Sequence, residues 1–528
     1  MNRAPHRVVD DLQDRLQPLE TRFHLDYWDS QIASTPESEA RRARSELELR
    51  TFMGDRVSLE AVKEALADGT HEPMLSRQLE VLRLTLTGDQ MTEAQRRELV
   101  EVTGKVESEF AKFRPKVDGR TLSENDIQDI LETSNDDQER KRAWLASKEI
   151  GHRVGGRVRE LARLHNGIAL ELGYADYYLM ALDLQEISED WLFGVLDDLD
   201  ALTRDSFVAW KDELDEGLRA RFGIEDLRPW HYADPFFQYA PDDGADLDLD
   251  AHFTDASTAP ELALKTFGAM GIDLSGVLDS SDLYPRELKC QHAFCLDIDR
   301  TGKDVRVLAN VVPGERWVEV MLHECGHAAY DVSIDRRLPY LLHAPAHTFV
   351  TEAIALLSGR LTRDPRWLTE VAGVSPTEVD PVAERLRRSS AIQSTMFARW
   401  VLVMAHFERA FYRDPETDLD ELWWDLVERF QLVTRPDEPV PGAWAAKVHV
   451  AVAPVYYHNY LLGELLASQL EETIEQRCPD GIVSREAGDL LKQGLLHHGN
   501  VMRWDKVIEE ATGRPLSAQA FAAQVTAS

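Results

Sequence analysis

The sequence predicts one large, mostly α-helical fold, and three observations carry this prediction. The chain has 528 residues, enough to bury a substantial core, and we expect one interlocked fold over residues 1–528 rather than separate small domains. Apolar residues recur at helical spacing from the first residues onward. The segments with a strand-like pattern are short, and no internal repeat or low-complexity tract stands out.

Residues 191–222 illustrate the helical pattern. Gly223 follows this stretch and suits a left-handed helix end. One stripe of the predicted helix carries its apolar side chains: Leu192, Val195, Leu196, Leu199 and Leu202. Further along, the acidic segment 242–250 predicts an exposed loop. We therefore expect an N-terminal helical half over 1–241 and a C-terminal half over 251–528.

The charge balance excludes some partners. The chain has 59 basic and 94 acidic residues, a formal net charge of −35. Such a surface repels nucleic acids and anionic membranes, so we expect neither as a partner. The N-terminus lacks the apolar core of a signal peptide, and no apolar run approaches the roughly 18–20 residues that span a bilayer. These features predict a cytoplasmic protein, and they leave its oligomeric state open.

An H-E-x-x-H motif at residues 323–327 predicts a metal centre. On a helix, His323 and His327 lie four residues apart on one face, so both imidazoles can reach one Zn²⁺ at about 2.0–2.1 Å. Glu324 projects beside them towards the water that such an ion activates, where its carboxylate can act as a general base. Apolar residues around the motif recur at helical spacing, which favours a half-buried helix. The combination is typical of zinc hydrolases.

A catalytic zinc ion usually has three protein ligands and one open position, so a third ligand is needed. Glu352 is our candidate, because it stands at the start of a second helical pattern that ends at Gly359. The sequence thus predicts one Zn²⁺ per chain, held by His323, His327 and Glu352. His343 and His347 lie between them and can ligate the metal, line the pocket or be solvated.

A β-hairpin is predicted ahead of the motif. Residues 292–299 and 304–312 have strand-like patterns, and Arg300–Lys303 between them suits a turn. The edge of such a hairpin can bind an extended peptide.

These and other segments resemble the zinc peptidases of the angiotensin-converting enzyme type and their relatives, the thimet-type and bacterial oligopeptidases. The resemblance is sharpest from about residue 289 to residue 470 and is weaker upstream. Besides the motif it rests on these stretches: Gln291–Phe294, Leu422–Leu426, Ala446–His449 and Tyr456–Glu464. It implies a mostly α-helical, two-lobed body with a deep central channel, a small β-hairpin or sheet by the active site, and short peptides as substrates.

The resemblance also implies the roles of residues that bind the substrate. By their places in the matching stretches, His292 and Ala293 hold the substrate chain. Lys447 binds its C-terminal carboxylate and His449 donates to one of its carbonyls. Tyr460 stabilises the oxyanion that forms during attack.

The chain departs from the family's pattern at the tyrosines. It has one extra residue between His449 and the tyrosine pair, so Tyr456 and Tyr457 compete for the carboxylate. Asn459 stands where chloride-activated members have arginine. The third-ligand helix has Leu356 where the angiotensin-converting type has an aspartate, a role that Asp331 could fill.

The resemblance favours a peptidase that releases C-terminal dipeptides. In the implied mechanism, zinc and Glu324 generate the nucleophile, and Glu324 returns the proton to the leaving amine. Two alternatives stay open. One is an oligoendopeptidase that cuts internal bonds of short peptides, and the other is an inactive peptide-binding protein with the same fold.

Overall fold

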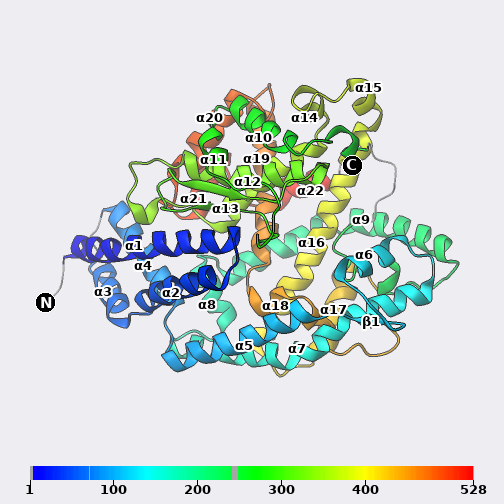
Figure 1. The fold of residues 1–528 in the computed structure, drawn as a ribbon, viewed down its shortest axis with the longest axis horizontal. Helices are drawn as coiled ribbons and strands as arrows, with labels where there is room; N and C mark the ends of the chain where they lie inside the picture. Colours follow the sequence, from blue (N-terminus) through cyan, green and yellow to red (C-terminus); the bar gives the residue numbers. More distant parts are fainter. Residues whose placement is uncertain (1–3, 70–71, 241–247, 527–528) are drawn as a thin grey trace. The chain divides into compact units, whose positions relative to one another are not determined.

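The computed structural model describes residues 4–69, 72–240 and 248–526 (Figure 1). Two compact units make up the chain. The first comprises residues 1–90, 246–387 and 462–521, and the second comprises residues 91–245, 388–461 and 522–528. Most of the acidic segment 242–250 lies outside the described residues. The predicted halves, 1–241 and 251–528, are continuous stretches of sequence, whereas each unit combines several stretches. The division into halves stays a prediction.

The first unit contains the H-E-x-x-H motif. Its N-terminal and central elements are α1 (Pro5–Ile32), α2 (Pro36–Met53), α3 (Arg56–Ala67), α4 (Pro73–Gly88), α10 (Thr258–Ala269), α11 (Ser275–Asp279), β3 (Phe294–Asp297), β4 (Val305–Leu308), α12 (Glu315–Ser333) and α13 (Thr348–Gly359). Its later helices are α14 (Pro365–Glu370), α15 (Pro376–Val379), α20 (Arg485–Gly494) and α21 (Trp504–Thr512). Short 3-10 turns connect several of these helices, for example Tyr340–Leu342 and Leu496–His498.

The second unit is also built mostly from helices. They are α5 (Glu93–Lys112), α6 (Glu124–Thr133), α7 (Asp137–Glu171), α8 (Tyr177–Leu184), α9 (Glu189–Phe222), α17 (Leu419–Gln431) and α18 (His449–Val452), with a minimal pair of strands β1 (Lys116–Val117) and β2 (Arg120–Thr121). Three helices have residues in both units: α16 (Ala383–Arg413), α19 (His458–Arg477) and α22 (Gln519–Thr526).

The mostly α-helical fold class is confirmed. Across the described residues the only sheets are two antiparallel pairs of strands. The helix predicted over 191–222 is α9, and Gly223 ends it with a φ of 67°. The same residues include no helix that is both long enough and apolar enough to cross a membrane. The deep channel stays a prediction.

The predicted hairpin forms, with strands shorter than expected. β3 pairs with β4 from Phe294 opposite Leu308 to Asp297 opposite Val305. The pairing stops because the Asp297 carboxylate accepts the N–H of Gly302 at 2.8 Å and closes the turn locally. Arg300 and Gly302 have φ values of 51° and 65° in this turn. The hairpin packs against α12 through β3 and β4, so it lies beside the motif.

Candidate metal centre and substrate-binding residues

The motif lies on α12, and the start of this helix is fixed from a distant part of the sequence. Gly314 precedes the helix with a φ of 129°, a conformation that favours glycine. The Asp250 side chain accepts the N–H of Glu315 at 2.8 Å. A carboxylate at this end of a helix satisfies a free donor and complements the helix dipole. The predicted helix around the motif is therefore present, with a defined start.

The Glu352 side chain comes from α13, which begins earlier than the sequence predicts. This helix starts at Thr348, and His347 caps it by accepting the N–H of Phe349 at 3.2 Å. Glu352 therefore lies in the second turn and not at the helix start. Gly359 at the other end has ordinary helical angles, and the chain continues into a 3-10 turn at Arg360–Arg363 instead of a left-handed cap.

α12 and α13 pack closely because α12 has a glycine where the two helices meet. α12 and α13 lie side by side (Figure 1). A Cβ on Gly326 would lie 2.7 Å from the Cα of Ala355 and 2.9 Å from the carbonyl oxygen of Ile354. On its other side α13 meets α19, where a Cβ on Gly463 would lie 3.0 Å from the Cγ of Glu352. The helix that carries Glu352 thus packs against two glycines.

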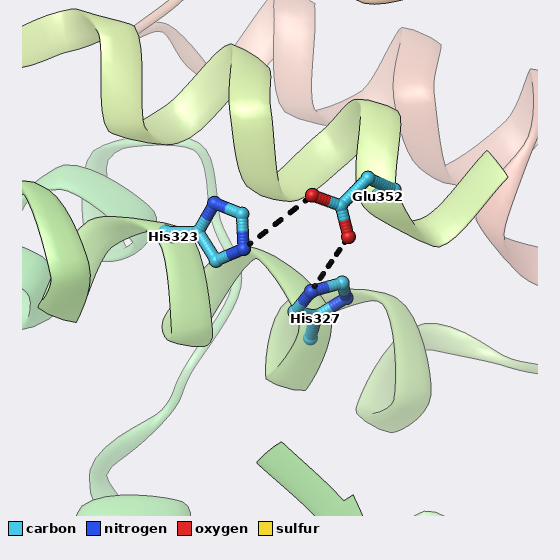
Figure 2. A group of neighbouring side chains, drawn as sticks. All are labelled: His323, His327 and Glu352. Carbon is cyan, nitrogen blue, oxygen red and sulfur yellow. Dashed lines mark ion pairs between the residues drawn. The ribbon is translucent and has the colours of Figure 1, made fainter. Parts of the chain in front are cut away.

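This packing brings the three predicted ligands together. Figure 2 shows His323 and His327 pointing from one helix towards Glu352 on its neighbour. The Nε2 atoms of the two histidines lie 3.7 Å and 3.6 Å from the carboxylate oxygens of Glu352. The three ligand atoms all lie within 4.8 Å of one another. Atoms bonded to one tetrahedral zinc ion at about 2.0–2.2 Å lie roughly 3.3–3.6 Å apart, so the cluster fits such an ion.

Thr351 orients one of these histidines. The Nδ1 of His327 lies 2.8 Å from the hydroxyl oxygen of Thr351, the residue before Glu352. A hydrogen bond at Nδ1 fixes the ring of a metal-binding histidine and leaves Nε2 free for the ion. The sequence suggests Asp331 for this role, but Thr351 occupies it. No pattern in the sequence points to Thr351, because the hydrogen bond depends on how α12 and α13 pack.

The two histidines between motif and third ligand do not join the cluster. His343 is buried, and among the described residues neither of its ring nitrogens has a hydrogen-bond partner. His347 serves as the cap of α13, and its ring lies against Phe349 and Trp504. This capping and packing role of His347 is not among the roles that the sequence left open.

Burial sets the protonation state of the cluster. It lowers the pKa of His323 to about 4 and, together with the His323 ring, the pKa of His327 to about 3. Both imidazoles are therefore neutral at pH 7, which is the form that binds a metal.

The surrounding carboxyl groups have raised pKa values. Burial, with a contribution from Glu352, raises the pKa of Glu324 to about 8. Burial, with a contribution from Glu464, raises the pKa of Glu352 to about 7. Glu319, one turn before His323, also has a pKa raised to about 7 by burial and by Glu315. Carboxyls gathered in a poorly hydrated site favour a divalent cation, whose charge stabilises their ionised forms.

Glu324 lies between the histidines and the hairpin. Its side chain is buried, and the backbone N–H of Cys295 on β3 donates to its carboxylate. The hairpin therefore orients the candidate general base. His292 and Ala293 stand just before β3, with His292 exposed and Ala293 half-buried. Their roles in holding a substrate stay predictions.

Lys447 lies in the second unit, among aromatic rings. Its ammonium group donates to the side-chain oxygen of Gln238 at 2.9 Å. It also lies 5.4 Å, 5.5 Å and 5.9 Å from the ring centroids of Phe236, Trp400 and Tyr457. Burial lowers its pKa to about 8. Gln238 is a residue that the sequence does not single out, because it lies 209 positions away.

The structure brings His449 and the tyrosines near this lysine. The ring of His449 lies 5.1 Å from that of Tyr457, edge to face, and its Nδ1 has no partner among the described residues. The Tyr460 ring lies 5.4 Å from Tyr457 and 5.3 Å from Tyr456. Of these three tyrosines, Tyr457 is the one whose ring lies near the ammonium of Lys447. It immediately precedes α19, whereas Tyr460 lies in its first turn.

Two family models match this chain. Residues 280–526 match the model of peptidase family M3, and residues 2–192 match the model named angiotensin-converting enzyme. No curated protein matches significantly. The first match contains the motif, Glu352, Lys447 and the tyrosines, and the second ends in α9. The two matches do not overlap and together include most of the chain.

Proposed function

We propose that this chain, which belongs to the superfamily of zinc metallopeptidases that comprises angiotensin-converting enzyme and the oligopeptidases, releases dipeptides from the C-termini of short peptides. The family membership establishes a metallopeptidase that acts on peptides. The dipeptide register, the ligands of the ion and the roles of single residues are parts of our proposal.

The lack of a paired anion at the buried ammonium group of Lys447 is the observation that carries this proposal. No carboxylate lies within 4 Å of its ammonium group among the described residues. Burial lowers the pKa of the nearby Lys148 well below its usual value, with a smaller contribution from Lys447, whereas the Asp234 carboxylate acts in the opposite direction on both lysines. The Asp234 oxygens already accept three backbone N–H groups. A buried cation without a paired anion is costly, so a ligand carboxylate suits this place.

In the proposed site, His323, His327 and Glu352 hold one zinc ion. When bound, such an ion polarises the peptide carbonyl and makes a water molecule more acidic. The neutral imidazoles and the acidic surroundings described above support this assignment. Zinc dependence is common to both matching families.

The protein's own residues move the protons. Glu324 takes a proton from the attacking water and passes it to the nitrogen of the leaving amine. Its buried carboxyl, oriented by the N–H of Cys295, supports this role. Tyr460 donates to the oxygen that becomes negative during attack. Lys447 and Tyr457 bind the terminal carboxylate, and His449 donates to a substrate carbonyl.

Internal cleavage by an oligoendopeptidase is the second candidate function. It is favoured by the match of the motif-bearing region to peptidase family M3 and not to the angiotensin-converting enzyme model. The two functions differ in what they require at the peptide's end. A dipeptidase of this kind needs a free C-terminal carboxylate, whereas an endopeptidase cuts amidated peptides equally well.

Mass-spectrometric mapping of products from matched free-acid and amidated peptides tests the proposal. We expect C-terminal dipeptides from the free acids only, and none after chelation or with Glu324→Gln. Lys447→Met should raise KM for free-acid peptides, while Lys105→Met, a change at an exposed lysine of the same unit, should not. Internal cuts in both peptide sets would establish the second function. Zinc binding without any cleavage would indicate an inactive peptide-binding protein.

A further inference from the structure

Val455 adopts a backbone conformation that its side chain disfavours. This buried residue lies between α18 and α19 and has a φ of 55°. A β-branched residue in the left-handed region is an outlier, and it persists only when the surrounding structure enforces it. Lys447 and His449 lie just before it and Tyr457 just after it. The enforced turn is therefore within the segment that carries the proposed carboxylate-binding residues.

Two side chains from other helices hold both backbone polar groups of Val455. The carboxylate of Glu408 on α16 accepts its N–H at 2.8 Å. The side-chain amide of Gln185, at the end of α8, donates to its carbonyl oxygen at 3.0 Å. The same amide also donates to the carbonyl of Ala181 at 3.0 Å, which anchors it to α8. We refer to Glu408 and Gln185 as the Val455 clamp.

The clamp also holds the first turn of α19. The side-chain oxygen of Gln185 accepts the amide of Asn459 at 2.8 Å and lies 3.1 Å from Nε2 of His458. Both of these side chains are buried. Gln185 thus binds Val455, which precedes Tyr456 and Tyr457. It also binds His458 and Asn459, which follow them. The tyrosine pair therefore lies between two parts of the chain that hydrogen bonds to Gln185 hold in place.

The environment of Glu408 indicates why a carboxyl group is present there. It is buried, and no lysine or arginine lies within ion-pair distance among the described residues. Instead it lies close enough to Tyr177, Tyr178 and Tyr412 to add to the rise in their pKa values that burial causes. A buried carboxyl without a cation is unfavourable in a core, so an apolar residue would pack more easily. It accepts a hydrogen bond from the N–H of Val455, which points to a role in holding that backbone.

The left-handed turn lies within the stretch where the sequence has an extra residue between His449 and the tyrosines. With Val455 in this conformation, the ring of Tyr457 lies against His449 and Trp400 and near the ammonium of Lys447. Tyr456 contacts Tyr460 instead. A regular backbone at this point would direct neighbouring side chains differently, since successive residues point to different sides of the chain.

We propose that Glu408 and Gln185 are positioning residues that hold Val455 in its left-handed turn and thereby select Tyr457, and not Tyr456, as the tyrosine that binds the substrate's terminal carboxylate beside Lys447. The inference rests on the proposed function, because it assumes that this pocket receives a C-terminus. It adds a structural reason for where the C-terminus of the substrate binds, and hence for which peptide bond is cut.

Four variants test the clamp. Glu408→Leu removes the acceptor and Glu408→Gln keeps one. Gln185→Ala, at a half-buried position, removes the hydrogen bond to the Val455 carbonyl together with those to His458 and Asn459. Val455→Gly keeps both backbone hydrogen bonds and suits a positive φ, so it serves as the matched control. A second control is Gln469→Leu, which removes a buried glutamine of the other unit.

Hydrogen exchange of the 453–460 segment gives a readout that is independent of catalysis. We expect Glu408→Leu and Gln185→Ala to lose protection there, while Glu408→Gln and Val455→Gly keep it. If the segment stays as protected in Gln185→Ala as in the wild type, the clamp does not exist and the proposal is overturned, whether or not Glu408→Leu folds.

Kinetics test what the clamp does. With free-acid peptides, we expect KM to rise on the order of 10-fold or more in Gln185→Ala and Glu408→Leu, with tripeptides appearing beside dipeptides, because a displaced tyrosine weakens binding steeply. Tyr457→Phe should raise KM and Tyr456→Phe should not. An unchanged register in a clamp variant that has lost protection, or an equal effect of the two tyrosine changes, overturns the proposal. If the wild type itself cuts amidated peptides equally well, the proposed function fails, which is distinct from either result.

Discussion

Replacing Gly326 by alanine tests how the candidate metal centre is assembled. The added Cβ would lie 2.7 Å from the Cα of Ala355 on α13. Carbon atoms in contact are normally about 3.5–4.0 Å apart, so α12 and α13 must separate by roughly 1 Å. Glu352 lies one turn before Ala355 on the same helix. Its carboxylate moves with the backbone, away from His323 and His327.

The size of the effect follows from two opposing contributions. Overpacking a tight contact costs about 1–3 kcal/mol, and alanine gains about 0.8–1.0 kcal/mol over glycine within a helix. We therefore expect the free energy of unfolding to fall by up to about 2 kcal/mol. Disturbed metal surroundings typically cost about 10–100-fold in affinity, and we expect a loss of this size for zinc. Competition with a chromophoric chelator measures the affinity, and urea unfolding measures the stability.

Gly156→Ala is the matched control. Gly156 lies within α7, and a Cβ there would meet nothing within 4 Å. This variant should gain about 0.8–1.0 kcal/mol of stability from helix propensity alone and bind zinc as the wild type does. If Gly326→Ala proves as stable as Gly156→Ala and retains wild-type zinc affinity, the close approach of the two helices does not set the geometry of the site.

Three further predictions concern single side chains. Thr351→Val should lower zinc affinity about 10–100-fold by releasing the His327 ring, and Thr351→Ser, which keeps the hydroxyl, should restore it in the same chelator competition. Glu324→Gln should lower kcat by about 10²–10⁴-fold while zinc affinity, measured on the same sample, changes little; a variant with near-normal kcat would exclude Glu324 as the general base. Burial lowers the pKa of Lys447 to about 8, so raising the pH above 8 removes its charge, and KM for free-acid peptides should rise about tenfold per pH unit there. Lys447→Arg stays charged and should flatten this rise between pH 8 and 9.5, and a rise of equal size in this variant would contradict the assignment.

The sequence predicts helices well where a local pattern defines them. The motif helix is present because its apolar residues repeat at helical spacing, and α9 ends at Gly223 as the glycine indicates. The predicted start of the helix that contains Glu352 is wrong, because α13 begins four residues before Glu352. There a histidine side chain acts as the cap, and histidine is not among the residues that usually mark a helix start.

The supporting residues of the site are harder to predict because each depends on a distant contact. Gln238 holds Lys447 from 209 positions away, and Asp250 caps α12 from 65 positions away. Neither has a local pattern around it that indicates a function. The hydroxyl of Thr351 faces His327 only because two helices cross closely at Gly326. The resemblance to a family supplied the substrate-binding residues, but it left the choice between Tyr456 and Tyr457 open.

The glycines on either side of α13 have a consequence for mutational mapping of this protein. Alanine scanning measures a residue by what is lost when its side chain is truncated. Gly326 and Gly463 have no side chain to lose, yet a Cβ at either would press on α13, at Ala355 or at Glu352 itself. A truncation scan would therefore identify Glu352 and overlook what places it. A complementary scan with larger residues would reveal these empty positions, and it would separate the residues that perform the chemistry from the space that allows it.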